Sequence, residues 1–372
     1  MILERFIIWI KNLPNLRGWA AVKSWGISAV ILFLIGGSAA YGFNRIFLSN
    51  STSAANIMPS NSAQNVKQVA NIPDPINGVL FTAADAAVWK NRLPLAVIIE
   101  NSVTARPESG LSQADLVYEA LAEGGITRQI AIFLTTPTPV TLGPVRSMRV
   151  YFLDWLEEYG AVAVHVGGND HALARISPEG VKDIDGIYVG SPTFIRTTDR
   201  YAPHNDYSAT DRLWALATKD GYTGSATFQS WLFKSDAPLA SRPPTQTINL
   251  GFLGDPEYAV KWVYDPKTNL YSKFDGGQPF IDRNNNQQIT AKTVVVQEVS
   301  YTLFAGEDAL NMQDIGSGPA YVFEDGVEVK GTWSKDSRTA RTIFYDANNN
   351  QIPFDRGQIW IDVVPPNSLV SF

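Results

Sequence analysis

The sequence predicts an α+β protein: an N-terminal transmembrane helix, a tether, a mixed α/β domain and a mostly β domain. Three observations support this prediction. An uncharged apolar run near the N-terminus is long enough to cross a bilayer. Strand-like and helix-like patterns then mix up to about residue 224, and beyond it only short alternating segments with turn residues remain. The expected parts are 1–48 (cytoplasmic stub and anchor), 49–74 (linker), 75–224 (mixed α/β domain) and 225–372 (β-rich domain).

The predicted anchor is a run of 21 residues without a charge, from Ser24 to Asn44. Positive charges concentrate before it, and Lys and Arg stay on the cytoplasmic side of a membrane. We therefore expect residues 24–48 to cross the cell membrane once, with the N-terminus inside and the main domains outside.

A cleaved signal peptide is the alternative for the same segment. Ser38-Ala39-Ala40 is a small-residue pattern of the kind that signal peptidases accept. Cleavage near Ala40 would remove the anchor, and both possibilities stay open at this stage.

Composition excludes several classes of function. The chain has 30 Lys+Arg and 36 Asp+Glu, of which five basic residues and one acidic residue lie in the first 50, so residues 51–372 carry a net charge of 25 − 35 = −10. Such an acidic domain disfavours nucleic-acid binding. The chain contains no Cys, which excludes disulfides, thiolate catalysis, Cys-ligated zinc and lipid attachment through a processed Cys.

The linker and the first domain follow from local patterns. Residues 49–74 are rich in Ser, Asn, Ala and Gln, which is typical of a flexible tether. We expect Ser147 to cap one helix, and Ser208 and Asp211 to form a capping box on another. The expected strands are 95–99, 115–122, 130–134 and 161–166, and the expected helices are 147–158, 169–176 and 208–219.

The second domain should be built from hairpins. Tyr258, Val260, Trp262 and Tyr264 alternate along one strand and should share a face. The other expected strands are 294–299, 321–323, 327–329, 342–345 and 358–364.

Two Asn-rich segments, 281–287 and 345–351, resemble calcium loops. In both segments the sixth position of such a loop is Gln rather than Gly. The twelfth position, which needs a bidentate Glu, is Thr293 in the first segment and Gly357 in the second. Hairpin turns without a metal explain both segments.

The first candidate site is the segment Gly143-Pro-Val-Arg-Ser-Met-Arg149. A turn leads into a helix, so free helix N–H groups and the guanidinium groups of Arg146 and Arg149 could bind phosphate, carboxylate or sulfate, with Ser147 beside them. The alternative is structural: Arg146 and Arg149 pair with Glu119 and Glu123 of the preceding strand.

The second candidate site is the turn from His165 to His171. Gly167 and Gly168 follow a predicted strand and would let the backbone approach a ligand. Their spacing matches neither a dinucleotide fingerprint nor a P-loop, so we expect no nucleotide cofactor.

The third candidate site contains Arg196, His204 and Asn205. All three histidines of the chain, His165, His171 and His204, fall in these last two sites. They could bind zinc, but the spacing of His165 and His171 fits neither a helix nor a strand pair, and we expect no metal. His165 or His204 could instead be a general acid–base, or the histidines could hold loops by hydrogen bonds.

Several segments in order resemble the YerB-like family of bacterial proteins. They are Pro94-Leu-Ala-Val-Ile-Ile-Glu-Asn101, Ala105-Arg-Pro-Glu-Ser-Gly-Leu-Ser-Gln-Ala-Asp115, Glu123-Gly-Gly-Ile-Thr-Arg128, Gly143-Pro-Val-Arg-Ser-Met-Arg149, His165-Val-Gly-Gly168, Ala202-Pro-His-Asn205, Gly316-Ser-Gly318, Asp325-Gly326, Gly331-Thr-Trp333 and Trp360-Ile-Asp-Val-Val364. The resemblance covers about residues 75–372. It implies a lipoprotein-like protein with an N-terminal domain, a β-rich C-terminal domain and no established biochemical activity. This chain departs from the lipoprotein pattern because it has no Cys to carry a lipid.

Together these observations predict a membrane-anchored extracytoplasmic protein that binds an anionic component of the cell envelope. An envelope hydrolase or phosphoryl-type transferase that uses a histidine is one alternative, and a protein-interaction module is another. The expected ligand-binding residues are Arg146, Ser147, Arg149, Gly167, Gly168, Arg196, His204 and Asn205, and the candidates for catalysis are His165 and His204.

Overall fold

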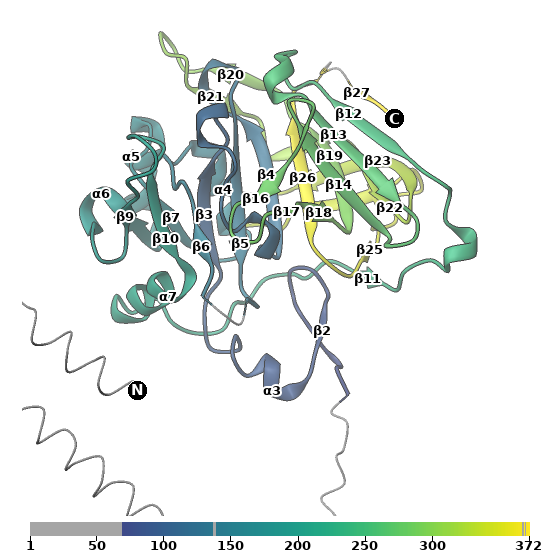
Figure 1. Ribbon diagram of the computed structural model, residues 1–372, viewed down its shortest axis with the longest axis horizontal. Helices are drawn as coiled ribbons and strands as arrows, with labels where there is room; N and C mark the ends of the chain where they lie inside the picture. The colour runs from purple at the N-terminus through teal and green to yellow at the C-terminus, as the bar shows by residue number, and fades with distance from the viewer. Residues whose placement is uncertain (1–68, 137–138, 367, 369) are drawn as a thin grey trace, which may run out of the picture. The chain divides into compact units, whose positions relative to one another are not determined.

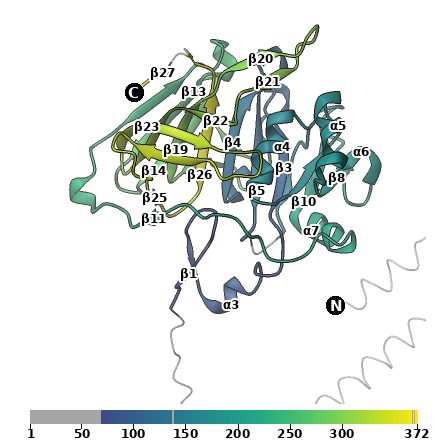
Figure 2. The same cartoon turned by 180° about the vertical axis from the view of Figure 1, so that it is seen from behind.

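A ten-stranded sheet contains strands from both halves of the chain (Figures 1 and 2). The computed structural model describes residues 69–136, 139–366, 368 and 370–372. The strand order is β24 (Ile343–Asp346), β23 (Val327–Lys335), β22 (Gly316–Glu324), β19 (Thr293–Glu298), β26 (Ile359–Val364), β4 (Leu116–Leu121), β5 (Thr127–Phe133), β3 (Leu95–Glu100), β7 (Val162–His165) and β8 (Asp183–Asp185).

The two halves of the chain join at the β26–β4 pair. These strands are parallel, with Ile359 opposite Leu116 and Val363 opposite Ala120. The hydrogen bonding of the sheet is therefore continuous across the boundary expected near residue 224. All six residues of β3, β4 and β26 are buried, which is why these strands are continuous apolar runs in the sequence.

A second sheet packs on the first. It contains β15 (Gln278–Pro279), β14 (Leu270–Asp275), β13 (Val260–Asp265), β12 (Thr247–Leu250) and β27 (Val370–Ser371), with β18 (Thr290–Ala291) beside β14. The burial of β13 alternates, as the sequence predicted. Its Trp262 ring lies 5.5 Å from the ring of Trp360 in β26, so these aromatic side chains fill the space between the sheets.

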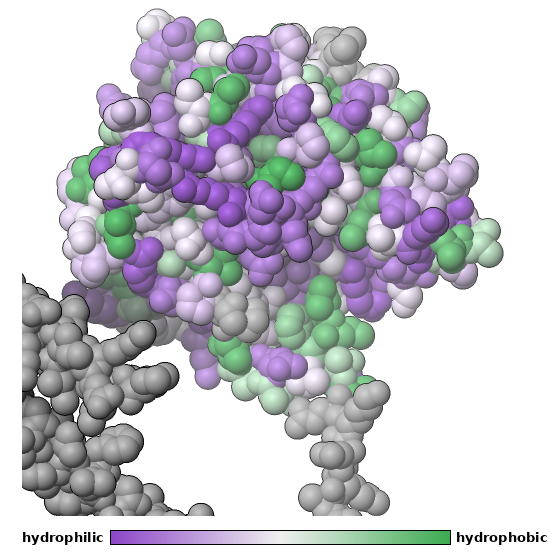
Figure 3. Space-filling model, viewed as in Figure 1, coloured by the Kyte–Doolittle hydropathy of each residue, from purple (hydrophilic) through white to green (hydrophobic). Residues whose placement is uncertain are grey.

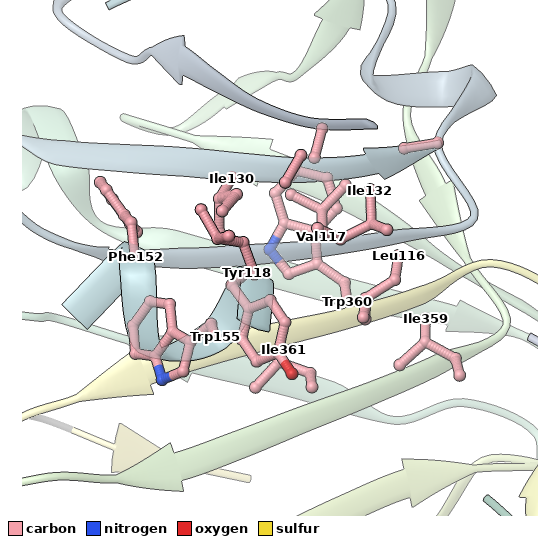
Figure 4. Close-up of a cluster of buried hydrophobic side chains, with 14 of the residues drawn as sticks. Leu116, Val117, Tyr118, Ile130, Ile132, Phe152, Trp155, Ile359, Trp360 and Ile361 are labelled. Atoms are coloured by element: carbon pink, nitrogen blue, oxygen red, sulfur yellow. The ribbon is translucent and has the colours of Figure 1, made fainter. Parts of the chain in front are cut away.

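Helices α5 to α7 gather at the end of the large sheet that β7 and β8 form, whereas α4 lies over the sheet beside β4 (Figures 1 and 2). These helices are α4 (Val150–Glu157), α5 (Asp170–Glu179), α6 (Gly186–Val189) and α7 (Thr210–Lys219). Trp155 of α4 stacks on Tyr118 of β4 with ring centroids 5.0 Å apart. Figure 4 shows Trp155 and Phe152 among the apolar side chains of β4, β5 and β26.

The remaining elements are short. They are β1 (Ile72–Pro73), β2 (Leu80–Phe81), α3 (Ala83–Ala86), β6 (Thr141–Leu142), β9 (Ile195–Arg196), β10 (Asp206–Ala209), β11 (Phe233–Lys234), β16 (Ile281–Asp282), β17 (Gln287–Gln288), β20 (Tyr301–Leu303), β21 (Leu310–Met312) and β25 (Phe354–Asp355). β1 pairs with β2, so the last residues of the expected linker belong to the folded part. Hydrophilic residues cover much of the face in Figure 3, and apolar residues gather near β2 and α3.

The described part of the protein is thus mostly β with few helices. The expected anchor, residues 24–48, and most of the linker lie outside the described residues. Among the helices of the described ranges, none combines the length and the apolar character that crossing a bilayer requires.

Two helices begin later than the sequence predicted. α4 begins at Val150 with Arg149 at the cap position, because the Ser147 hydroxyl donates to the carbonyl of Val166 at 3.2 Å instead of capping the helix. α7 begins at Thr210. The predicted capping box is wrong, because Ser208 belongs to β10 and its hydroxyl donates to the carbonyl of Thr193 at 2.8 Å.

Both Asn-rich segments form the predicted turns. One closes the β16–β17 hairpin. The other is closed by an isolated antiparallel β-bridge between Tyr345 and Gln351. The carboxylate of Asp282 accepts hydrogen bonds from the main-chain N–H groups of Gly110 and Ser112, at 3.1 and 2.9 Å. This aspartate therefore connects the hairpin to the first half of the chain.

Candidate functional site

Three arginine side chains converge near the turn that precedes α4. Arg128, from β5, donates to the main-chain carbonyl of Ser147 at 3.1 Å, and Arg149 donates to the same carbonyl at 3.2 Å. Arg146 is the residue before this serine, and its charge acts on Arg128. We call Arg128, Arg146 and Arg149 the arginine cluster.

Arg149 is held by Glu123 in a bidentate pair. Its Nε lies 2.5 Å from Oε1 of Glu123, and its Nη2 contacts Oε2. Burial opposes ionisation of Glu123, but the hydrogen bonds and charge of Arg149 outweigh burial, so the pKa of Glu123 lies below its ordinary value. The pairing that the sequence suggested as an alternative is present for Arg149.

Arg146 pairs with Glu100, not with Glu119. Its Nε lies 3.2 Å from Oε1 of Glu100, which is the last residue of β3 and only 3% exposed. Glu119 pairs instead with the buried Lys273 at 3.0 Å. The suggested pairing of Arg146 with Glu119 is wrong, because the second sheet brings a lysine to that face of β4.

Arg128 has no carboxylate within ion-pair distance among the described residues. The residue is 7% exposed, and its Nε has no hydrogen-bond partner in the described part of the chain. Burial, followed by the charges of Arg149 and Arg146, lowers the pKa of Arg128 to about 10. Three guanidinium groups therefore share two carboxylates, and the cluster carries excess positive charge in an acidic protein.

His204 reaches the same carboxylate as Arg146. Its Nδ1 lies 3.0 Å from Oε1 of Glu100, and the Ser102 hydroxyl donates to that oxygen at 2.9 Å. On the other side of the ring, Nε2 lies 3.3 Å from the hydroxyl of the exposed Thr104. If Nδ1 donates to Glu100, Nε2 is free to accept a proton, which is the arrangement of a general base.

Gly167 and Gly168 border the arginine cluster. The carbonyl of Gly167 accepts from the N–H of Met148 at 2.9 Å, and the N–H of Gly167 donates to Asp185 at 2.8 Å. A Cβ on Gly168 would lie 2.9 Å from the side chain of Leu173. These glycines let two chain segments approach each other closely.

Arg196 and Asn205 close the loop that presents His204. Arg196 donates to Oδ1 of Asn205 at 2.9 Å and pairs with Asp206 at 3.1 Å. The Asn205 amide donates to the carbonyls of Thr197 and Arg200, at 2.9 and 3.2 Å. The side chains of these two predicted residues bond to their own loop.

The other two histidines contact different partners from those of His204. His165 is fully buried, with Nε2 2.6 Å from Asp183 and Nδ1 2.7 Å from the carbonyl of Gly167. Burial disfavours its charged form, but Asp183 outweighs burial and the pKa of His165 is raised. His171 stacks on Phe304 with ring centroids 3.7 Å apart. Within the described residues, no group of three or more His, Cys, Asp or Glu is placed to hold a metal ion.

Sequence reasoning missed Glu100, Thr104 and Arg128. Glu100 and Arg128 are charged residues at the ends of otherwise apolar strands, and such residues are rarely buried without a specific role. That pattern was an available signal for both. Thr104 lies in a short 3₁₀ helix, Val103–Ala105, and has no comparable signal.

Comparisons with known proteins agree with this architecture. Residues 81–223 match the family model described as "Protein of unknown function (DUF3048) N-terminal domain". Residues 248–361 match the model described as "Protein of unknown function (DUF3048) C-terminal domain". The chain is 29% identical over 275 residues to "Putative lipoprotein YerB" of Bacillus subtilis (strain 168), across 74% of this chain and 82% of that protein. The crystal structure of YerB from Bacillus subtilis matches with a TM-score of 0.72 and 26% identity, and covers 81% of this chain and 100% of that chain. The two matched domains, their order and the shared fold show that this chain belongs to the YerB-like DUF3048 family.

Proposed function

We propose that this protein is anchored in the cell membrane by residues 24–48 and binds an anionic component of the cell envelope at the arginine cluster. The name of the Bacillus subtilis relative, "Putative lipoprotein YerB", supports a membrane-associated location. This chain has no Cys to carry a lipid, so its own apolar segment would serve as the anchor.

The observation that carries the proposal is that the buried Arg128 has no carboxylate within ion-pair distance among the described residues. Burying a guanidinium group costs several kcal/mol unless an opposite charge compensates it. Glu100 and Glu123 already pair with Arg146 and Arg149. A bound phosphate or carboxylate would offset this cost, because its oxygens match the planar fork of arginine.

The first turn of α4 adds to this attraction. α4 begins at Val150, directly after Arg149. The N-terminus of a helix carries partial positive charge, so the helix dipole would act on the same anion as the guanidinium groups. The rest of the exterior part is acidic, which would limit anion binding elsewhere.

Thermal unfolding of the full chain in detergent tests this proposal. The probes are inorganic phosphate, phosphorylated and carboxylated envelope fragments, and peptidoglycan fragments. A ligand at 100 times its Kd should stabilise the protein by about 2.7 kcal/mol. Arg146→Gln and Arg149→Gln should abolish the stabilisation.

Arg212→Gln is the matched control, because Arg212 donates at 2.9 Å to the carbonyl of Pro192, away from the arginine cluster. It should behave like the wild type. If no probe stabilises the wild type, or if the cluster variants respond as the control does, the proposal is wrong.

A second candidate function is hydrolysis or phosphoryl-type transfer, with His204 as the general base. The specific observation is that this imidazole lies between the buried Glu100 and the exposed hydroxyl of Thr104. Turnover of a panel compound should then be lost in His204→Gln and Glu100→Gln. Phosphate binding that survives in His204→Gln, with no turnover by the wild type, would favour the binding function.

A further inference from the structure

An exposed apolar patch lies on β2 and α3, close to the point where the described part of the chain begins (Figures 1 and 3). Leu80 is 43% exposed and Val88 is 52% exposed. Three alanines of the same segment are exposed as well, Ala83, Ala84 and Ala87. We call these five residues the α3 patch.

The α3 patch contains little charge. Among residues 69–88, the exposed side chains include a single charged one, that of Asp85. Its carboxylate accepts from the hydroxyl of Thr82 at 2.7 Å, and the same hydroxyl caps α3. Hydrophilic residues cover much of the remaining face in Figure 3. An apolar patch on such a surface is typical of a site that contacts a protein or a membrane.

The elements that carry the patch are packed against the rest of the protein. β2 pairs with β1, with Leu80 opposite Pro73. In the turn between them, a Cβ on Gly78 would lie 2.3 Å from the ring of Phe233, so this turn lies directly on that side chain. The rings of Phe81 and the buried Trp89 meet edge to face at 6.2 Å. The apolar side chains of the patch are therefore presented by a supported element.

The chain enters the folded part beside this patch. Val69 is the first described residue, and the N–H of Asn71 donates to the carbonyl of Phe81 at 3.0 Å. Only residues 49–68 connect Val69 to the proposed anchor. A flexible linker of that length has a root-mean-square length of about 25 Å, whereas a folded part of about 300 residues is about 50 Å across. The end that carries α3 would therefore stay closer to the bilayer than the opposite end.

We propose that the α3 patch docks the folded part on the surface of the lipid bilayer. This inference rests on the proposed anchor, residues 24–48. Leu80 and Val88 enter the boundary between the head groups and the acyl chains, where buried apolar area holds peripheral elements on a membrane. The exposed Lys90 lies at the level of the head groups, because its apolar stem and charged end suit that boundary. β20, at the opposite end of the folded part in Figures 1 and 2, faces away from the bilayer.

A dye attached to a single cysteine tests the docking, because the natural chain contains no Cys. Full-length Val88→Cys carries an environment-sensitive dye in vesicles of phosphatidylcholine and phosphatidylglycerol. Leu303→Cys is the matched control, since Leu303 is 54% exposed and belongs to β20. The dye on Val88→Cys should shift its emission to the blue and lose intensity to a quencher carried by the lipid. The dye on Leu303→Cys should do neither.

A charged variant shows whether the apolar side chains cause the docking. The dye is placed on Ala84→Cys, and Leu80→Glu and Val88→Glu are added to that chain. Ala84→Cys alone should show the blue shift and the quenching, and the charged variant should lose both. Leu80 and Val88 are exposed, so urea unfolding of the charged variant should match that of Ala84→Cys.

Flotation of the vesicles separates this inference from the proposed anchor. If the chain floats but the dyes on Val88→Cys and Leu303→Cys behave alike, the docking is wrong and the anchor stands. Blue-shifted emission that the lipid-borne quencher does not reduce means that protein covers the patch, which also overturns the docking. Quenching that persists in the charged variant overturns it as well. A chain that does not float overturns the anchor and the docking together.

Discussion

Oε1 of Glu100 lies 3.0 Å from Nδ1 of His204, although the two residues are 104 positions apart in the sequence. The same oxygen also contacts Arg146 and Ser102. One buried carboxylate thus connects the end of β3, the turn before α4 and the loop that presents His204. The geometry of the candidate site depends on this residue.

Replacing Glu100 with Gln should lower the free energy of unfolding by about 1–3 kcal/mol. The amide keeps the shape of the side chain, but Arg146 loses its ion pair. The hydrogen bonds of this nearly buried side chain with Ser102 and His204 change as well. Urea unfolding measures the effect, and the exposed Asp220→Asn is the control. A loss below about 0.5 kcal/mol, the range of ordinary surface substitutions, would show that Glu100 does not hold the site together.

Replacing Lys273 with Met should cost about 3–5 kcal/mol, because it leaves buried carboxylates without their cation. Lys273 is fully buried and lies 3.0 Å from Glu119 and 3.6 Å from Asp275. Adding Glu119→Gln to the Met variant should restore part of the loss, since it removes one uncompensated charge. Urea unfolding of both variants checks this. Equal stability of the wild type and Lys273→Met would contradict the prediction.

The stability of the protein should fall as pH rises from about 5 to 8. Burial raises the pKa of Glu108 from 4.5 to about 8. Between these values the folded state holds a proton that the unfolded state has lost, so the stabilisation is complete below the unfolded pKa and is lost as pH rises through the folded pKa. The loss approaches about 1.4 kcal/mol per pH unit for each such group.

Glu108→Gln isolates this contribution. Its free energy of unfolding should depend less steeply on pH than that of the wild type, whereas Glu257→Gln, at an exposed position, should leave the slope unchanged. Urea unfolding at pH 5, 6, 7 and 8 gives the slopes. Identical slopes for Glu108→Gln and the wild type would show that Glu108 is ionised in the folded protein at neutral pH.

An uncleaved anchor should keep the mature protein in the membrane fraction after a high-pH wash. Mass spectrometry of the mature chain checks the alternative, because cleavage after Ala40 would remove the uncharged run up to that residue. Replacing Ile31 and Leu34 with Lys should release an anchored protein, since charges in a membrane segment cost about 2.5–3.5 kcal/mol each. A mature chain that begins near Tyr41 would contradict the anchor.

Local patterns located the strands well and the helix starts poorly. The run Leu95–Ile99 predicted all but the last residue of β3, because a strand buried on both faces is continuously apolar. Ser147 and Ser208 resemble helix caps, but each hydroxyl donates to a main-chain carbonyl outside the helix, that of Val166 for Ser147 and that of Thr193 for Ser208. A cap depends on where the preceding chain lies, which local sequence does not determine.

The contacts of the candidate site were harder to predict than its residues. Arg146 and His204 were both expected, yet the carboxylate that joins them was not. The pairing of Glu119 with Lys273 depends on a second sheet that packs over β4, and the parallel pairing of β26 with β4 unites distant parts of the chain. Strand order of this kind depends on long-range packing, and one sequence does not reveal it.

Phosphate-dependent unfolding of Arg128→Met tests the central claim most directly. Met fills much of the volume of Arg128 without its unpaired charge. The variant should be about as stable as the wild type without ligand, or more stable, because removing a buried uncompensated charge offsets the lost hydrogen bond to Ser147. Saturating phosphate should stabilise the wild type by about 2.7 kcal/mol and the variant by almost nothing. Equal stabilisation of both proteins, or of neither, would contradict anion binding at the arginine cluster.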